Sequence, residues 1–193
     1  MMSLSKLALL LLIGMFSVSA LADYQLDNTQ SSLHFVSIKK DKIAETHSFL
    51  RLSGSISADG AAKIIIDLAS VETNIDIRNE RMKSLLLETG VYPTAEVSAI
   101  LDEAQLTGIA AGSSVILPTA LTLNLHGHSA AIQADLRVTG LEDGALLVTT
   151  VKPVLLNAFD FSLDAGIQKL MEVAKLPSIS TAVPVTFTLV FKR

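Results

Sequence analysis

The sequence contains few side chains whose types and spacing predict chemistry, and His126 and His128 are the first of them. Two imidazoles two residues apart on a strand are a spacing that zinc sites use. Gly127 between them indicates a turn, and the sequence marks no third ligand, so we predict no metal site. His34 and His47 could join such a site only through the fold.

The acidic side chains give no stronger evidence of catalysis. Glu142-Asp143 and Asp102-Glu103 fall in expected loops, where solvated charges are common. The chain lacks a glycine-rich phosphate loop and the motifs G-x-S-x-G and H-E-x-x-H. We therefore predict that the protein is not an enzyme and holds no cofactor. The alternative is a polar catalytic cluster inside the fold that includes His34 or His47.

Two arginines offer a possible site for a charged group. Arg78 and Arg81 are three residues apart on an expected helix, so both can point in one direction and hold an anionic head group. The alternative is that they belong to the solvated face of that helix.

The segment that carries these arginines, Asp76 to Pro93, is predicted to be a helix. Its apolar residues recur at roughly helical spacing, at Ile77, Met82, Leu85 and Leu86. Asn74 or Asp76 can cap its start. Gly90 can supply a left-handed residue at its end, and Pro93 prevents it from continuing.

Most of the remaining sequence alternates between apolar and polar residues, as strands do. We expect antiparallel strands joined by hairpins at Ala58-Asp59-Gly60 and Glu142-Asp143-Gly144, and a probable turn at His126-Gly127. A second short helix is expected at 164–175, with Asp164 as its cap. The expected strands cover residues 24–26, 31–40, 43–57, 61–70, 94–101, 115–125, 132–138, 146–151 and 181–193. Eight strands suffice to close a barrel around one small ligand, but a two-sheet sandwich has the same local pattern.

The first 22 residues are predicted to be a signal peptide. Lys6 precedes an apolar run of about a dozen residues, shorter than the roughly 20 that span a bilayer. Ala20 and Ala22 then have the small-residue spacing of a cleavage site. We expect cleavage between Ala22 and Asp23, which leaves an exported or periplasmic protein of 171 residues (193 minus 22) without a transmembrane anchor.

The composition excludes several classes of protein. Without the leader the chain has 14 basic and 19 acidic residues and no basic stripe, so we predict no nucleic-acid partner. Cysteine is absent, which excludes disulfides and thiol chemistry. Half of the residues are hydrophobic, with nine aromatics (seven Phe, two Tyr) and no Trp. Most of the hydrophobic residues are therefore aliphatic, and they exceed what one packed core needs. This excess suggests a lined cavity or strands that are apolar on both faces.

Five short motifs, taken in order, resemble the YceI-like family of exported lipid- or polyisoprenoid-binding proteins. They are S-S-L-H-F-V at Ser31 to Val36, F-L-R-L-S-G at Phe49 to Gly54, V-E-T-N-I-D-I-R-N-E-R-M at Val71 to Met82, Y-P-T-A-E-V at Tyr92 to Val97 and L-T-L-N-L-H-G at Leu121 to Gly127. Each motif is short, but their order and spacing are specific. The resemblance covers Asp23 to Arg193, which we interpret as a single domain.

The resemblance has two gaps. The helix of the family usually opens Arg-Asp-x-His-Leu, whereas this chain has Arg78-Asn79-Glu80-Arg81-Met82. The His that often ends the second strand is replaced by Lys39 and Lys40. The chain therefore resembles a divergent member, and roles tied to those positions are not carried over.

The resemblance implies a mainly β fold, an antiparallel eight-stranded lipocalin-like β-barrel with two short helices. It also implies an interior that takes a long apolar or amphiphilic lipid, isoprenoid-, quinone- or fatty-acid-like, for transport, storage or sequestration. We predict that Met82, Leu85 and Leu86 face inward from the helix. The other predicted lining residues are Phe49, Leu52, Ile66, Tyr92, Leu123, Phe159, Phe161 and Phe187.

Two other functions stay open. One is an exported enzyme that acts on a small lipidic substrate. The other is a structural or stress protein with a filled barrel and a protein partner. We expect a monomer or a homodimer.

Overall fold

The computed structural model describes residues 24–102, 106 and 109–193. The predicted signal peptide lies outside these residues, as does Glu103 of the second acidic pair, so export and cleavage stay predictions. In the described ranges, no helix is long and apolar enough to cross a membrane.

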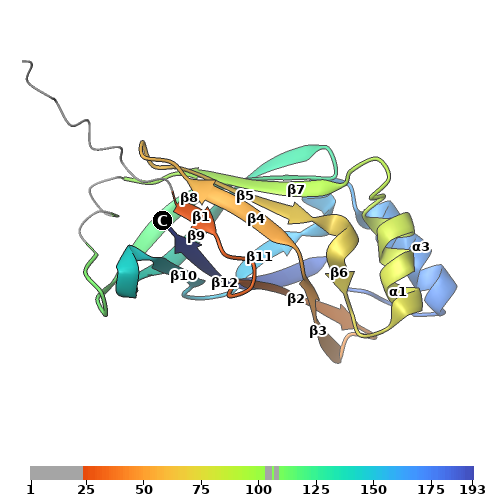
Figure 1. Cartoon of the computed structure of the whole chain (residues 1–193). Helices are drawn as coiled ribbons and strands as arrows, with labels where there is room; N and C mark the ends of the chain where they lie inside the picture. The colour runs from red at the N-terminus through yellow and green to blue at the C-terminus, as the bar shows by residue number, and fades with distance from the viewer. Residues whose placement is uncertain (1–23, 103–105, 107–108) are drawn as a thin grey trace, which may run out of the picture.

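In the part of the chain that the structure describes, twelve strands form one antiparallel sheet (Figure 1). They are β1 (Tyr24–Leu26), β2 (Ser32–Lys39), β3 (Ile43–Phe49), β4 (Leu52–Ile56), β5 (Ala61–Asp67), β6 (Val71–Glu72), β7 (Thr94–Ile100), β8 (Ser114–Leu125), β9 (His128–Gly140), β10 (Leu146–Thr150), β11 (Val154–Asn157) and β12 (Ala182–Lys192).

The twelve strands close into an eight-stranded barrel because four pairs of them run end to end. β1 and β2 both pair with one edge of β12, and β10 and β11 pair with its other edge. β4 pairs with β1, and β3 pairs with β2. In the next position around the barrel, β5 pairs with β4 and β6 pairs with β3. β7, β8 and β9 complete the circuit to β10. The predicted eight-stranded antiparallel barrel is confirmed.

The predicted strand at residues 43–57 is interrupted at Leu50 and Arg51, between β3 and β4. There the backbone bonds to Asn28 as well as to the backbone of Asp67 and Ser70. Asn28 donates to the carbonyl of Leu50 at 3.1 Å and accepts from the amide of Leu52 at 2.7 Å. Gly54 lies within the regular β4–β5 register and forms no bulge. A Cβ there would be 2.4 Å from the carbonyl oxygen of Lys63, so the close approach of the strands requires glycine.

Both predicted helices are present, and Figure 1 shows them side by side at one end of the barrel. The first comprises α1 (Asp76–Arg81) followed by a π-helical turn, η2 (Met82–Leu86). The second is α3 (Asp164–Ala174). Gly166 of α3 allows the two to approach closely, because a Cβ there would be 2.7 Å from the carbonyl oxygen of Leu85.

The predicted helix caps are wrong. Ile75 and Leu163 are the N-cap residues, and neither helix has a side-chain cap bond. Asn74 is in the left-handed conformation, and Asp164 is already inside α3. Glu88, not Gly90, takes the left-handed conformation after the first helix. A backbone bond from Leu87 to the carbonyl of Met82 at 2.8 Å closes the π turn and ends this helix.

Candidate lipid-binding site

The barrel encloses a cavity of about 490 Å³ that extends to the end covered by the helices. Its wall is formed mainly by aliphatic and aromatic side chains from β2, β3, β7, β8, β11 and β12, together with η2, η4 (Ala158–Phe161) and α3. Pockets that bury small molecules commonly have volumes of roughly 300–1,000 Å³. The barrel is therefore hollow, which disagrees with the alternative of an interior filled by packed side chains.

Seven of the eleven predicted lining residues lie in this wall. They are Phe49, Ile66, Met82, Leu86, Leu123, Phe161 and Phe187. These residues come from six different elements, so the barrel brings together side chains separated by up to 138 positions (187 minus 49) in the sequence.

The other four predicted lining residues lie outside the wall. Leu52 is buried in the core and pairs with Ile66 on β5, so it faces the same side as that wall residue without itself lining the cavity. The ring of Tyr92 lies against the ring of His126, with centroids 4.4 Å apart. Phe159 is 60% exposed, in the turn that directs Phe161 inward.

Leu85 is the fourth, and the π-helical turn explains its position. In a regular helix, Met82 would share its face with Leu85 and Leu86. A π turn has its hydrogen bond from residue i+5 to residue i, so the face shifts by one position. The wall accordingly contains Met82, Leu86 and Leu87.

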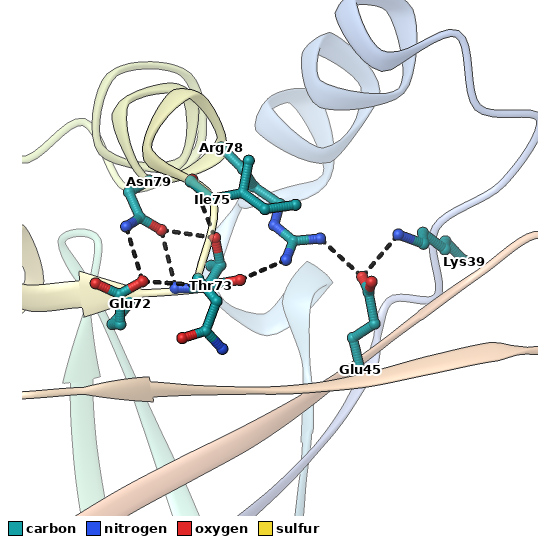
Figure 2. Close-up of polar contacts among 8 residues, drawn as sticks. Lys39, Glu45, Glu72, Thr73, Ile75, Arg78 and Asn79 are labelled. Atoms are coloured by element: carbon teal, nitrogen blue, oxygen red, sulfur yellow. Dashed lines mark hydrogen bonds and ion pairs between the residues drawn. The ribbon is translucent and has the colours of Figure 1, made fainter.

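Figure 2 shows a chain of three charged side chains, Lys39, Glu45 and Arg78, and all three line the cavity near its mouth. Arg78 of α1 donates from Nη1 to Oε2 of Glu45 at 2.7 Å, and Lys39 donates to the same oxygen at 2.7 Å. The hydrogen bond from Lys39 and the charge of Arg78 hold the pKa of Glu45 below its usual value. Two cations thus share one carboxylate, which leaves excess positive charge at the mouth.

A second set of bonds fixes the start of α1 above this mouth (Figure 2). Asn79 accepts from the amide and hydroxyl of Thr73 at 2.9 and 2.6 Å and donates to Glu72 at 3.1 Å. Arg78 donates from Nη2 to the carbonyl of Thr73 at 2.6 Å. Asn79 is buried and faces these partners, so this part of the altered helix motif has a structural role.

His47, which the sequence placed inside the fold only for the alternative of an enzyme, lies in the site. It is 5% exposed and lies in the cavity wall. Its ring meets the ring of Phe35 edge-on, with the two ring centroids 5.4 Å apart. Burial lowers the pKa of its imidazole, and the charge of Arg78 lowers it further. Glu45, His47 and Phe49 alternate on β3, so all three face the cavity. That alternation was the sequence signal that could have identified them.

Two buried nitrogen atoms beside the cavity have no hydrogen-bond partner among the described residues. They are Nδ1 of His47 and Nε of Arg78. A buried polar atom without a partner costs about 1–3 kcal/mol, so such atoms are rare in folded proteins. Arg81 also lies in the wall, and the role of Arg78 and Arg81 in holding an anionic head group stays a prediction.

The other histidines do not form a site. His126 bonds the carbonyl of Phe161 at 3.2 Å and Glu88 at 3.0 Å, where it links the end of the first helix to η4. His128 and His34 are exposed. Within the described ranges, no group of three or more His, Asp or Glu side chains is placed to hold a metal ion.

Comparison with known proteins matches nearly the whole described chain to one family of domains. The model of the YceI-like domain matches residues 24–191. A polyisoprenoid-binding domain from Saccharophagus degradans, implicated in plant cell wall breakdown, is 44% identical, with a TM-score of 0.86 over 88% of this chain and 97% of that one. No curated protein sequence matches the chain significantly.

Two more distant structures share the fold alone. BcnA from Burkholderia cenocepacia is 18% identical, with a TM-score of 0.63 over 86% of this chain and 98% of its own. The YceI protein of Campylobacter jejuni is 16% identical, with a TM-score of 0.52 over 75% of this chain and 82% of its own.

Proposed function

Because this chain belongs to the YceI-like family, we propose that it is a lipid-binding barrel protein that holds a long apolar or amphiphilic lipid, isoprenoid-like, in its cavity. The cavity of about 490 Å³ with a mainly hydrocarbon wall is the observation that carries this proposal. Removal of apolar surface from water contributes about 25 cal/mol per Å², so a long hydrocarbon chain gains free energy along its whole length. The polyisoprenoid binding of the Saccharophagus degradans relative supports an isoprenoid-like tail.

The protein acts in this proposal without catalysis, in transport, storage or sequestration. A binding cavity for a hydrocarbon chain needs apolar walls, and aliphatic and aromatic side chains form most of this wall. We place this activity in the periplasm or outside the cell because of the leader-like N-terminal sequence.

The proposal is tested by the lipid content of the purified protein. We expect organic extracts of protein from its native host to contain one dominant lipid by mass spectrometry, and delipidated protein to take up an added isoprenoid quinone. Since the chain has no Trp, uptake is measured by displacement of a fluorescent lipid probe. An extract without lipid, together with no uptake, would overturn the proposal.

A further inference from the structure

Two exposed isoleucines lie where the cavity opens to solvent. Ile75 is 46% exposed and Ile77 is 59% exposed, yet both also line the cavity. Figure 2 shows Ile75 close to Arg78, whose amide donates to the carbonyl of Ile75 at 2.9 Å. The apolar surface of the cavity therefore continues onto the outside of the protein, next to a cation.

Three segments of the chain surround this opening, and we call them together the rim. They are residues 39–45 between β2 and β3, residues 75–83 of the first helix and residues 172–180 at the end of α3, and each contributes side chains to the cavity wall. The first and third are joined, because the amide of Lys40 donates to the carbonyl of Ser178 at 3.1 Å and the hydroxyl of Ser178 donates to Asp41 at 2.6 Å. The ion pair of Arg78 with Glu45 joins the first to the second. The rim is thus one connected surface.

The rim is basic although the protein as a whole is acidic. After residue 22, seven of the 14 basic residues but only five of the 19 acidic residues lie in the rim. The rim therefore has a formal charge of +2, whereas the rest of this part of the chain has −7. Lys40 and Lys42 are exposed at the tip of the turn, and neither forms an ion pair within the described ranges.

Exposed apolar side chains beside lysine and arginine are the combination with which proteins bind the surface of an anionic bilayer. The apolar side chains enter the boundary between head groups and acyl chains, and the cations are attracted to the anionic lipids. At this rim, such contact would join the hydrocarbon of the bilayer to the apolar wall of the cavity. A lipid tail could then pass from one to the other without crossing water. An acidic protein would match the charge of the rim but would not explain the isoleucines at the opening.

We propose that the rim is a docking surface for an anionic phospholipid bilayer, which Ile75 and Ile77 enter and to which Lys40 and Lys42 are attracted. This inference goes beyond the proposed function, because it concerns the outer surface of the protein and a second partner. It rests on the proposed function only for its purpose, which is exchange of the bound lipid with a membrane.

The test is sedimentation of the protein, purified from its native host, with lipid vesicles. One set of vesicles contains phosphatidylglycerol and phosphatidylcholine in equal parts, and the other contains phosphatidylcholine alone. We expect tighter binding to the anionic vesicles, and we expect added salt to weaken it, because salt screens exposed charges.

A pair of lysine variants tests the charge of the rim. Lys40→Gln combined with Lys42→Gln should weaken binding to the anionic vesicles about 5- to 30-fold, since each cation near such a surface contributes about fivefold. Lys63→Gln combined with Lys152→Gln removes the same charge outside the rim and should change this binding by no more than about twofold. Lys40 and Lys42 lie outside the cavity wall, so displacement of the fluorescent lipid probe should be unchanged in the rim variant.

A second pair of variants tests the apolar contact. Ile77→Ser should weaken binding to the anionic vesicles about 3- to 10-fold, because it removes hydrocarbon that the bilayer would bury. Ile100→Ser changes an isoleucine that is more exposed but lies outside the rim, at the end of β7, and should leave vesicle binding unchanged.

The docking surface and the proposed function fail separately in these experiments. Equal binding to the two kinds of vesicle, or equal effects of the rim variants and their controls, would overturn the docking surface. Lipid uptake without vesicle binding would also overturn it, would leave the proposed function intact and would favour an acidic protein as the partner of the rim. Vesicle binding that depends on the rim, without lipid uptake, would support the docking surface and overturn the proposed function.

Discussion

Arg78 and Glu45 join helix α1 to strand β3 across the mouth of the barrel through a 2.7 Å ion pair. The two residues are 33 positions apart in the sequence, and their side chains are only 25% and 32% exposed. Because Arg78 also bonds the carbonyl of Thr73, one guanidinium holds both the start of the helix and the wall below it. The ion pair therefore fixes the helix that covers the lipid-binding cavity.

We predict that Arg78→Met loosens this cover. The variant leaves Glu45 with Lys39 alone and frees the carbonyl of Thr73, so unfolding should become easier by about 1–2 kcal/mol, between the values for exposed and buried pairs. Amide hydrogen exchange in α1 should accelerate more than exchange in β8. The control is Lys63→Met, which breaks the more exposed Lys63–Glu96 pair and should cost no more than about 1 kcal/mol. Equal effects of the two variants on α1 would contradict this role for Arg78.

A second prediction concerns pH and His47. Its pKa in the folded protein lies below the usual 6.5 because the imidazole is buried. The unfolded chain therefore binds more protons than the folded protein as the pH falls below about 6.5, and stability falls with it until the folded pKa is reached. Each unit of pH in this window changes the free energy of unfolding by at most about 1.4 kcal/mol.

The variant His47→Leu should flatten this dependence. Urea unfolding between pH 5 and pH 8, followed by circular dichroism, should give a smaller slope for the variant than for the unaltered protein. His34→Leu, at an exposed position, is the matched control and should keep the original slope. Identical slopes for all three proteins would show that His47 titrates alike in the folded and unfolded states.

The strands and both helices could be predicted from the sequence because local patterns encode them, whereas closure of the strands into a barrel was implied by the family resemblance. Period-two alternation at Thr94–Ile100 and Ala182–Lys192 fixes which side chains face inward as long as the strand is regular. Leu123 and Phe187 lie on such strands, and both are in the cavity wall.

One failure occurs where the backbone departs from regular geometry. Leu85 lies in a π turn, so a count along a regular helix gives the wrong face. Glu45 was missed although it alternates with Phe49 on β3, and its ion pair with Arg78 of a distant helix is a contact that no local pattern specifies. Polar residues of a site are therefore harder to predict than its apolar wall.

A third prediction tests the contact between α3 and η2. Gly166→Val places a side chain where a Cβ would already be 2.7 Å from the carbonyl oxygen of Leu85 and 2.8 Å from Cα of Leu86. The helices must separate, and we expect a loss of about 1–3 kcal/mol in the free energy of unfolding, together with weaker lipid binding. Gly90→Ala is the control, because no atom lies within 4 Å of its added Cβ. Unchanged thermal stability of Gly166→Val would contradict the close packing of the two helices.

A fourth prediction separates lipid binding from stability by filling the cavity. Val97 lies on β7 with its side chain in the cavity wall, so Val97→Phe replaces empty space with a ring that occupies part of the path of the lipid tail. We expect lipid affinity to fall about tenfold or more, because each buried CH₂ of the tail that is displaced loses about 0.8 kcal/mol. The hollow interior can accept the ring, so the midpoint of thermal unfolding of the lipid-free protein should not fall. Ile100→Phe is the matched control on the same strand, where the side chain is 79% exposed, and it should leave affinity unchanged. If Val97→Phe bound the lipid as tightly as the unaltered protein, the lipid would have to bind outside this part of the cavity.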